Sequence, residues 1–254
     1  MPLIGEIAAL TAAVFWAISL TLYTHFGRGI PSGALNLYKM MFATTGLIGF
    51  IILNRNPWPQ DNSDAIMLGL SGLIGLAVSD TALFMALKRL GASLTSVIQS
   101  LVPPLSAILA WFFLNESLSV IETIGLAITT TAVTFVVYLG RDPKEPSLKV
   151  KSAVKFGITL AVIAAACQAC SMVLTRSAVQ NTDPVMATVI RMMPAALLLF
   201  LFNAQSRKGI PIIVKNPVTR LWISLAALLG TLLGLVLYRK SKPTLRGSTT
   251  MPMK

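Results

Sequence analysis

Three charged side chains lie inside long apolar stretches of this chain, where an ionisable group needs either a partner or a task. Lys39 and Arg191 each lie about one turn inside an apolar segment, and Asp80 lies deeper in another. An unpaired carboxylate in the middle of a membrane helix costs roughly 2.5–3.5 kcal/mol on insertion scales. We therefore expect Asp80 either to pair with Lys39 or to face water, where its carboxylate could take up a coupling proton.

Two interpretations of the cations remain open from the sequence. Lys39 and Arg191 could face a central cavity and attract an anionic or carboxylate solute, since charge inside a membrane marks functional sites. Alternatively, both side chains could extend to the lipid–water interface, which their position near helix ends allows. For Asp80 the alternatives are a proton-coupling site and a structural ion pair with Lys39, and we favour the ion pair.

Polar and aromatic residues in further segments could line a cavity for an organic solute. Trp16 and Ser19 in the first apolar segment, and Gln168 and Ser171 in the sixth, would lie near the middle of a membrane. Indole, hydroxyl and amide groups at that depth suit an amphipathic organic molecule. Gln99 could face the same cavity, although its alternative role is a hydrogen bond between helices.

Pro103 and Pro104 predict an interruption of the fourth apolar segment. Proline has no backbone N–H and clashes with the preceding turn, so two consecutive prolines kink or break a helix. The carbonyl groups released by such a break could line a cavity, as broken helices do in transporters. Proline is also tolerated in membrane helices, so this pair predicts a bend more firmly than it predicts a binding site.

No set of residues in the sequence predicts catalysis, a metal site or a cofactor. Cys167 and Cys170 have a spacing found in redox and zinc sites, but they lie in an apolar run without nearby histidine or acid, which favours packing. The sequence contains neither a GxxxxGK[ST] phosphate loop nor a nucleophile–base pair. We therefore expect neither an enzyme nor an ATP-driven pump.

The composition indicates what kind of structure must position these residues. Of 254 residues, 55% are hydrophobic and 12% are charged, and the mean hydropathy is +0.75. Soluble domains carry about 25% charged residues, so this chain has too few charged side chains to form a surface that faces water. The net charge of +12 is scattered between apolar runs, as in loops at a membrane surface, rather than gathered into a patch for nucleic acid. We expect the chain to lie in a lipid bilayer.

Apolar runs long enough to cross a hydrocarbon core of ~30 Å recur along the chain. They are about twice the length of barrel strands and do not alternate, so they predict helices. The expected fold class is all-α, a multi-pass transmembrane bundle of about eight helices. The predicted spans are 4–23, 35–53, 66–87, 92–114, 118–139, 154–176, 185–203 and 220–238.

The chain also contains an internal repeat. Shifting the sequence by 152 positions places the first span on the sixth and the second on the seventh, so that Ser19 meets Ser171 and Lys39 meets Arg191. A five-helix unit must be followed by an inverted copy, which is the architecture of secondary transporters. The predicted parts are a first repeat at 1–140, a linker at 141–153, an incomplete second repeat of three helices at 154–238, and a basic, non-spanning tail at 239–254.

The sequence resembles the drug/metabolite transporter superfamily, and within it the EamA-type transporters with ten helices. The resemblance rests on the segments FWAISL, YKMMFA, GLIGLAVSDTALFMALKRLGAS and SVIQSLVPPLSAILAWFFLNESLSVIETIGLAIT. It implies export of a small organic metabolite or drug across the inner or plasma membrane of a cell, with alternating access between inverted repeats. The solute could be anionic or amphipathic. Whether a proton is coupled to transport, and whether the chain forms a homodimer, are left undecided by the sequence.

In length the sequence differs from this family. A ten-helix member has two more helices after the eighth, whereas this chain continues as YRKSKPTLRGSTTMPMK, which is too hydrophilic to span. The alternative to a transporter is therefore a non-transporting, truncated remnant or a membrane subunit that depends on assembly with a partner. The distribution of Lys and Arg favours an external amino terminus, whereas the resemblance implies cytoplasmic termini, which we adopt.

Overall fold

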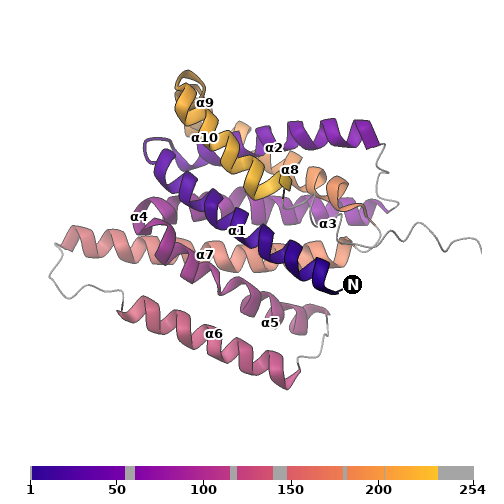
Figure 1. The fold of residues 1–254 in the computed structure, drawn as a ribbon, viewed down its shortest axis with the longest axis vertical. Helices are drawn as coiled ribbons and strands as arrows, with labels where there is room; N and C mark the ends of the chain where they lie inside the picture. The colour runs from indigo at the N-terminus through magenta and orange to yellow at the C-terminus, as the bar shows by residue number, and fades with distance from the viewer. Residues whose placement is uncertain are drawn as a thin grey trace, which may run out of the picture.

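The structure, a computed structural model, describes residues 2–54, 61–114, 119–139, 148–179, 182–202 and 204–233. Within these ranges every regular element is a helix (Figure 1), which confirms the predicted all-α class of a multi-pass helical bundle. The elements are α1 (Pro2–Phe26), α2 (Ser32–Asn54), α3 (Asn62–Gly72), the π-helix η1 (Leu73–Ser79), α4 (Asp80–Gln99), α5 (Val102–Leu114), α6 (Val120–Leu139), α7 (Leu148–Ala178), α8 (Pro184–Phe202), α9 (Ala204–Lys215), α10 (Pro217–Ala227) and the π-helix η2 (Leu228–Leu233).

The described helices overlap every predicted span. Five of them are long and apolar enough to cross a membrane, and α9 and α10, bent by 111°, could together form a sixth span. Two shorter apolar helices, Leu10–Phe26 and Val102–Leu114, overlap the first and fourth predicted spans. The four-part division of the chain stays a prediction, and its tail at 239–254 and linker residues 141–147 lie outside the described residues.

One helical rod runs from Asn62 to Gln99 through α3, η1 and α4. The sequence predicted a boundary between two spans at residues 88–91, and the helix is interrupted there at Gly91, whose φ of 78° and ψ of 174° are not helical. A residue with a side chain rarely adopts that conformation, so glycine permits the kink at which the two helical segments of α4 meet.

The end of this rod comes just before the two prolines. α4 ends at Gln99 and α5 begins at Val102, so the predicted span 92–114 is divided between two helices. Pro103 and Pro104 then lie in the first turn of α5, where backbone N–H groups have no partner within the helix. Proline is therefore accommodated at these positions without the loss of a hydrogen bond.

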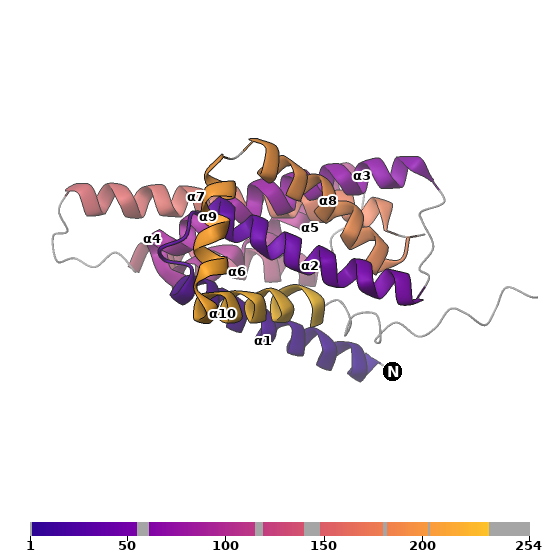
Figure 2. The same ribbon diagram turned by 90° about the horizontal axis from the view of Figure 1, so that it is seen from above.

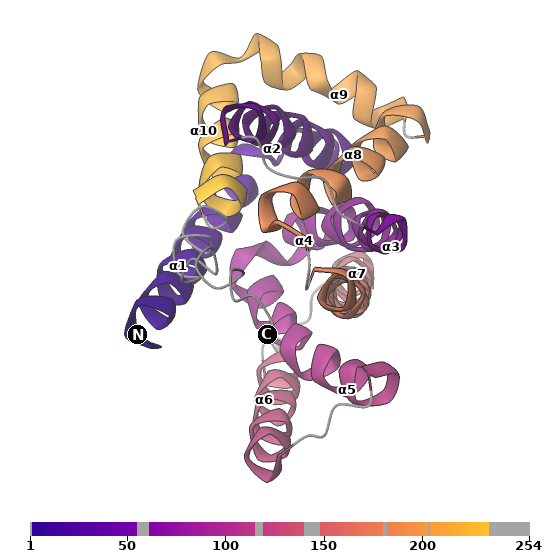
Figure 3. The same cartoon turned by 90° about the vertical axis from the view of Figure 1, so that its right-hand side faces the viewer.

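Residues 204–215 form the helix α9, where the sequence predicted only a connection between two spans. One face of α9 packs on α2: Ile213 is fully buried, and Gly209 lies directly against Ala34 and Pro31. Figure 3 shows α9 lying across α2. Tertiary packing of one apolar face thus stabilises a helix that is too polar to be recognised from the sequence as a span by itself.

Small side chains allow α7 to lie at the centre of the bundle. Ala161, Ala164, Ala165 and Ala169 are fully buried, and α7 contacts α3, η1, α4 and α5. α1 packs instead along α10 and η2 (Figure 2), while α6 lies at the edge against α4 and α5. The first helix of each predicted repeat therefore packs on the third span of the other repeat.

Candidate functional site

A buried ion pair joins α2 to α4. The Lys39 ammonium donates to Oδ2 of Asp80, and the two side chains are only 12% and 14% exposed. The same ammonium lies 5.5 Å from the centre of the Phe84 ring, which adds a cation–π contact. Each charge is thus compensated where it lies, as a low-dielectric interior requires.

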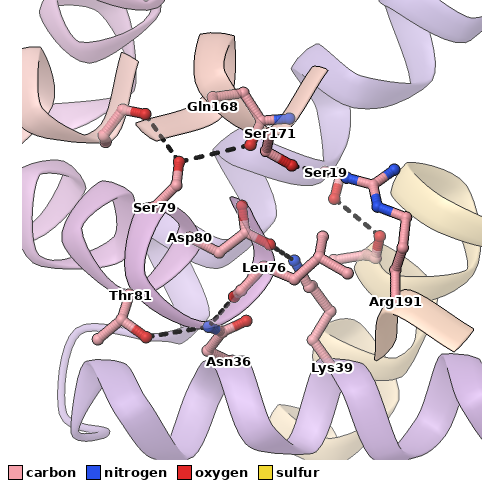
Figure 4. Close-up of polar contacts among 12 residues, drawn as sticks. Ser19, Asn36, Lys39, Leu76, Ser79, Asp80, Thr81, Gln168, Ser171 and Arg191 are labelled. Atoms are coloured by element: carbon pink, nitrogen blue, oxygen red, sulfur yellow. Dashed lines mark hydrogen bonds and ion pairs between the residues drawn. The ribbon is translucent and has the colours of Figure 1, made fainter. Parts of the chain in front are cut away.

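Asp80 directly follows the π-helix η1, a rare element that occurs mostly at functional sites. The irregular turn has carbonyl groups that can accept from other helices. Nδ2 of Asn36 donates to the carbonyl oxygen of Leu76 at 2.8 Å and to Oγ1 of Thr81 at 3.0 Å (Figure 4). Asn36 therefore fixes the segment that carries Asp80 onto α2.

Two serines, equivalent in the predicted repeat, contact the two π-helical regions. Ser171 Oγ on α7 donates to the carbonyl oxygen of Ser71 at 2.8 Å, and Ser19 Oγ on α1 donates to the carbonyl oxygen of Ala226 at 2.7 Å. Each acceptor lies two residues before a π-helix. In each case a serine from one predicted repeat bonds to a carbonyl group just before the π-helix of the other repeat.

Glycine allows each of these serines to approach. A Cβ atom on Gly75 would lie 2.5 Å from Ser171 Cβ, and one on Gly230 would lie 2.6 Å from Ser19 Oγ. Both distances are shorter than side chains tolerate, so the two contacts need glycine.

A cavity of about 260 Å³ lies beside the ion pair, between α1, α4, α5 and α7. Its wall combines apolar and polar side chains. The lining residues are Trp16, Ser79, Asp80, Leu83, Gln99, Val102, Pro103, Gln168 and Met172. Oδ1 of Asp80 forms no hydrogen bond within the described chain, because the ion pair uses only Oδ2. This oxygen is therefore open to a bound solute.

Two glutamines bring amide groups to the same wall. Gln99 is only 8% exposed, and its amide has no hydrogen-bond partner among the described residues. Gln168 Oε1 makes one long contact, 3.4 Å from Ser79 Oγ, since that hydroxyl donates to the carbonyl oxygen of Ala164 at 2.8 Å. The amide atoms of Gln99 are not fully buried, so they reach the cavity and are available to a ligand there.

The structure brings several residues singled out from the sequence to one cavity. These residues are Trp16, Asp80, Gln99, Pro103 and Gln168. Lys39 lies behind Asp80, Ser19 and Ser171 bind backbone carbonyl groups, and Pro104 lines a separate hollow beside α6. A part in solute binding stays a prediction for all of them.

Sequence reasoning missed four of the lining residues, namely Ser79, Leu83, Val102 and Met172. Ser79 and Val102 are sequence neighbours of predicted residues. Leu83 and Met172 lie one helical turn after Asp80 and Gln168, so the helical period could have identified them.

Arg191 has a different environment from Lys39, although the repeat makes the two residues equivalent. Its Nη2 donates to Ser171 Oγ at 3.0 Å, and its Nε is buried without a partner. No carboxylate of the described chain forms an ion pair with Arg191, but Asp80 interacts with it electrostatically. Figure 4 shows Asp80 paired with Lys39, with the Arg191 side chain nearby but not bonded to Asp80.

Among the described residues, no group of three or more His, Cys, Asp or Glu side chains could hold a metal ion. Cys167 and Cys170 on α7 are free thiols. What the cavity offers is a set of hydrogen-bonding groups on an apolar wall, which is suited to holding a small solute.

Comparison with known proteins gives one match. The model of the EamA-like transporter family matches residues 3–138 and 155–248. No protein of curated function and no solved structure matches the chain.

Proposed function

Because this chain belongs to the EamA-like transporter family, whose members are membrane transporters and not enzymes, we propose that it exports a small organic solute as a secondary transporter. The observation that carries the proposal is the cavity beside the Lys39–Asp80 pair. It combines an apolar wall with a few convergent polar groups, which is the composition of small-molecule sites. The solute would occupy this cavity on its way across the bilayer.

The proposed mechanism is alternating access between two inverted repeats. It is supported by the crossed packing of the bundle, in which α1 lies on α10 and η2 while α7 lies on α3 and η1. Ser19 and Ser171 would keep each repeat in contact with the π-helical region of the other as the halves rock. Glycine at positions 75 and 230 would keep both contacts close.

The ion pair has two parts in this proposal. It keeps the Asp80 carboxylate charged beside the cavity, and it ties α2 to α4. If a proton is coupled to export, Asp80 is the group that would carry it, since it is the ionisable residue that lines the cavity. Protonation would release Lys39, because a neutral carboxyl no longer compensates its charge.

Export can be measured without knowing the solute. Cells fed ¹³C-labelled glucose would be grown with and without the chain, and the labelled compounds in the medium would be compared by mass spectrometry. We expect at least one compound to accumulate outside cells that produce the chain. Asp80→Asn should abolish that accumulation, and so should Lys39→Ala.

Matched control variants separate this effect from a general loss of charge. Asp61→Asn changes an exposed carboxylate at the N-cap of α3, just before the same helical rod, and Lys215→Ala removes an exposed cation at the end of α9. Both should export like the original chain. The double variant Lys39→Met/Asp80→Asn removes both charges together and so avoids an unpaired buried ion. If it exports at the original rate, or if no compound accumulates with the original chain present in the membrane, the proposal is refuted.

A further inference from the structure

The unpaired amide of Gln99 is the strongest sign of what the cavity binds. The residue is more than nine-tenths buried, it has no hydrogen-bond partner within the described chain, and it lines the cavity. Its amide atoms are not among the fully buried polar atoms of the described chain, so they reach the open space of the cavity. They can therefore bond to water when the cavity is empty and to a bound molecule when it is occupied.

Hydrogen-bonding groups of both kinds meet at this wall. Gln99 and Gln168 each offer an acceptor and two donor hydrogens, because the Gln168 oxygen has only a long contact of 3.4 Å with Ser79 Oγ. Oδ1 of Asp80 adds a further acceptor. A ligand that satisfies this wall must therefore both donate and accept hydrogen bonds.

The charges around the cavity disfavour a headgroup with a net charge. Asp80 is the charged residue among the lining side chains, and its charge is balanced by Lys39. A cationic solute would have to compete with Lys39 for the Asp80 carboxylate. An anionic solute would find no cation on the wall, because Lys39 lies behind Asp80 and Arg191 is bonded to Ser171.

The rest of the wall sets the size and character of the ligand. Trp16, Leu83 and Met172 supply apolar surface, and the volume of about 260 Å³ lies just below the range of roughly 300–1,000 Å³ typical of ligand pockets. The ligand should be small, with one polar end and an apolar body.

We propose that Gln99 and Gln168 recognise an uncharged polar headgroup of the carboxamide type, with both donor and acceptor groups, on a small apolar molecule. This inference rests on the proposed transport function, because it assigns the class of solute to the same cavity. It narrows the anionic or amphipathic solute left open by the sequence to a net-neutral amphipathic one.

Three probes of similar size and different charge test the assignment. Benzamide, benzoate and benzylammonium share one ring and differ in the headgroup, and their binding to the purified full chain in detergent can be measured by equilibrium dialysis. We expect saturable binding of benzamide, with the two ions at least tenfold weaker. Equal or tighter binding of either ion would overturn the proposal.

Gln99→Met separates recognition from a structural role. We expect it to weaken benzamide binding at least tenfold while leaving the unfolding temperature of the ligand-free chain unchanged or higher, because no intramolecular hydrogen bond is lost. Gln168→Met should have a smaller effect on binding. Thr130→Val, on the edge helix α6, is a matched control that should bind like the original chain.

The two proposals fail separately. Benzamide binding by the original chain and equally by Gln99→Met would overturn the role of the amide and leave transport standing, as would a lower unfolding temperature for Gln99→Met. If the chain exports nothing but still binds benzamide, and only the glutamine variants lose this binding, transport is refuted. The assignment of the headgroup is then retained.

Discussion

Gly75→Ala adds one methyl group at a close contact between the two predicted repeats. The new Cβ would lie 2.5 Å from Ser171 Cβ and nearer still to Ser171 Oγ, with Gln168 Oε1 at 3.5 Å. Ser171 cannot simply turn away, because its Cβ belongs to the clash and its hydroxyl is bonded to the carbonyl oxygen of Ser71. Either η1 or α7 must therefore shift.

The expected loss in the free energy of unfolding is about 0.5–3.5 kcal/mol. Overpacking costs ~1–3 kcal/mol, and loss of the Ser171 hydrogen bond costs ~0.5–1.5 kcal/mol. The higher helix propensity of alanine offsets ~1 kcal/mol of this. Gly49→Ala is the matched control, because nothing lies within 4 Å of its added Cβ, and it should be neutral or stabilising.

Unfolding of the purified chain in detergent, followed by circular dichroism, measures both variants. A second variant, Gly75→Ala/Ser171→Gly, removes both clashing atoms, so we expect it to be more stable than the two single changes predict together. The coupling from this double-mutant cycle should be at least ~0.5 kcal/mol. A Gly75→Ala chain as stable as Gly49→Ala, or the absence of coupling, would refute the close contact.

Two other predictions concern the helical rod from Asn62 to Gln99. Gly91→Ala should destabilise by about 1–3 kcal/mol through backbone strain alone, since nothing lies within 4 Å of the added Cβ at φ 78°; unchanged denaturant unfolding would contradict it. At the other end, the Ser63 backbone N–H donates to the Asp61 carboxylate and holds the pKa of Asp61 below its ordinary value of 3.8. The folded pKa is the lower one, so the cap is fully formed above the ordinary pKa and is lost as pH falls through the lowered pKa. At low pH, amide hydrogen exchange in the first turn of α3 should be faster than expected from the rest of the helix, because the cap is lost. Asp61→Asn should not show this increase, and the same pH profile in both chains would disprove the prediction.

The ion pair could be foreseen from the sequence because an unpaired charge in an apolar segment costs much free energy wherever it lies. An acid in the middle of an apolar run must find a cation, and Lys39 is a basic residue in a neighbouring span. The helix break just before Pro103 and Pro104 could be foreseen in the same way, since a proline N atom can donate no hydrogen bond to the preceding turn in any surroundings.

Other features depend on packing between distant segments and leave little trace in the sequence. The π-helices coincide with hydroxyl donors that arrive from the opposite repeat, as with Ser171 at Ser71. α9 is a helix because one of its faces packs on α2. The unpaired amide of Gln99 could be recognised only once every neighbour was in position, because a sequence shows which groups can bond but not which are left without a partner.

The crossed packing of the bundle has a consequence for its biosynthesis. Ser19 and the carbonyl oxygen of Ala226 that it binds are separated by 207 residues. At a synthesis rate of roughly 5–20 residues per second, α1 would wait on the order of 10–40 s for this partner after its own insertion. During that interval the Ser19 hydroxyl lacks this acceptor. This contact between the predicted repeats can therefore form only after the second half of the chain has been made and inserted.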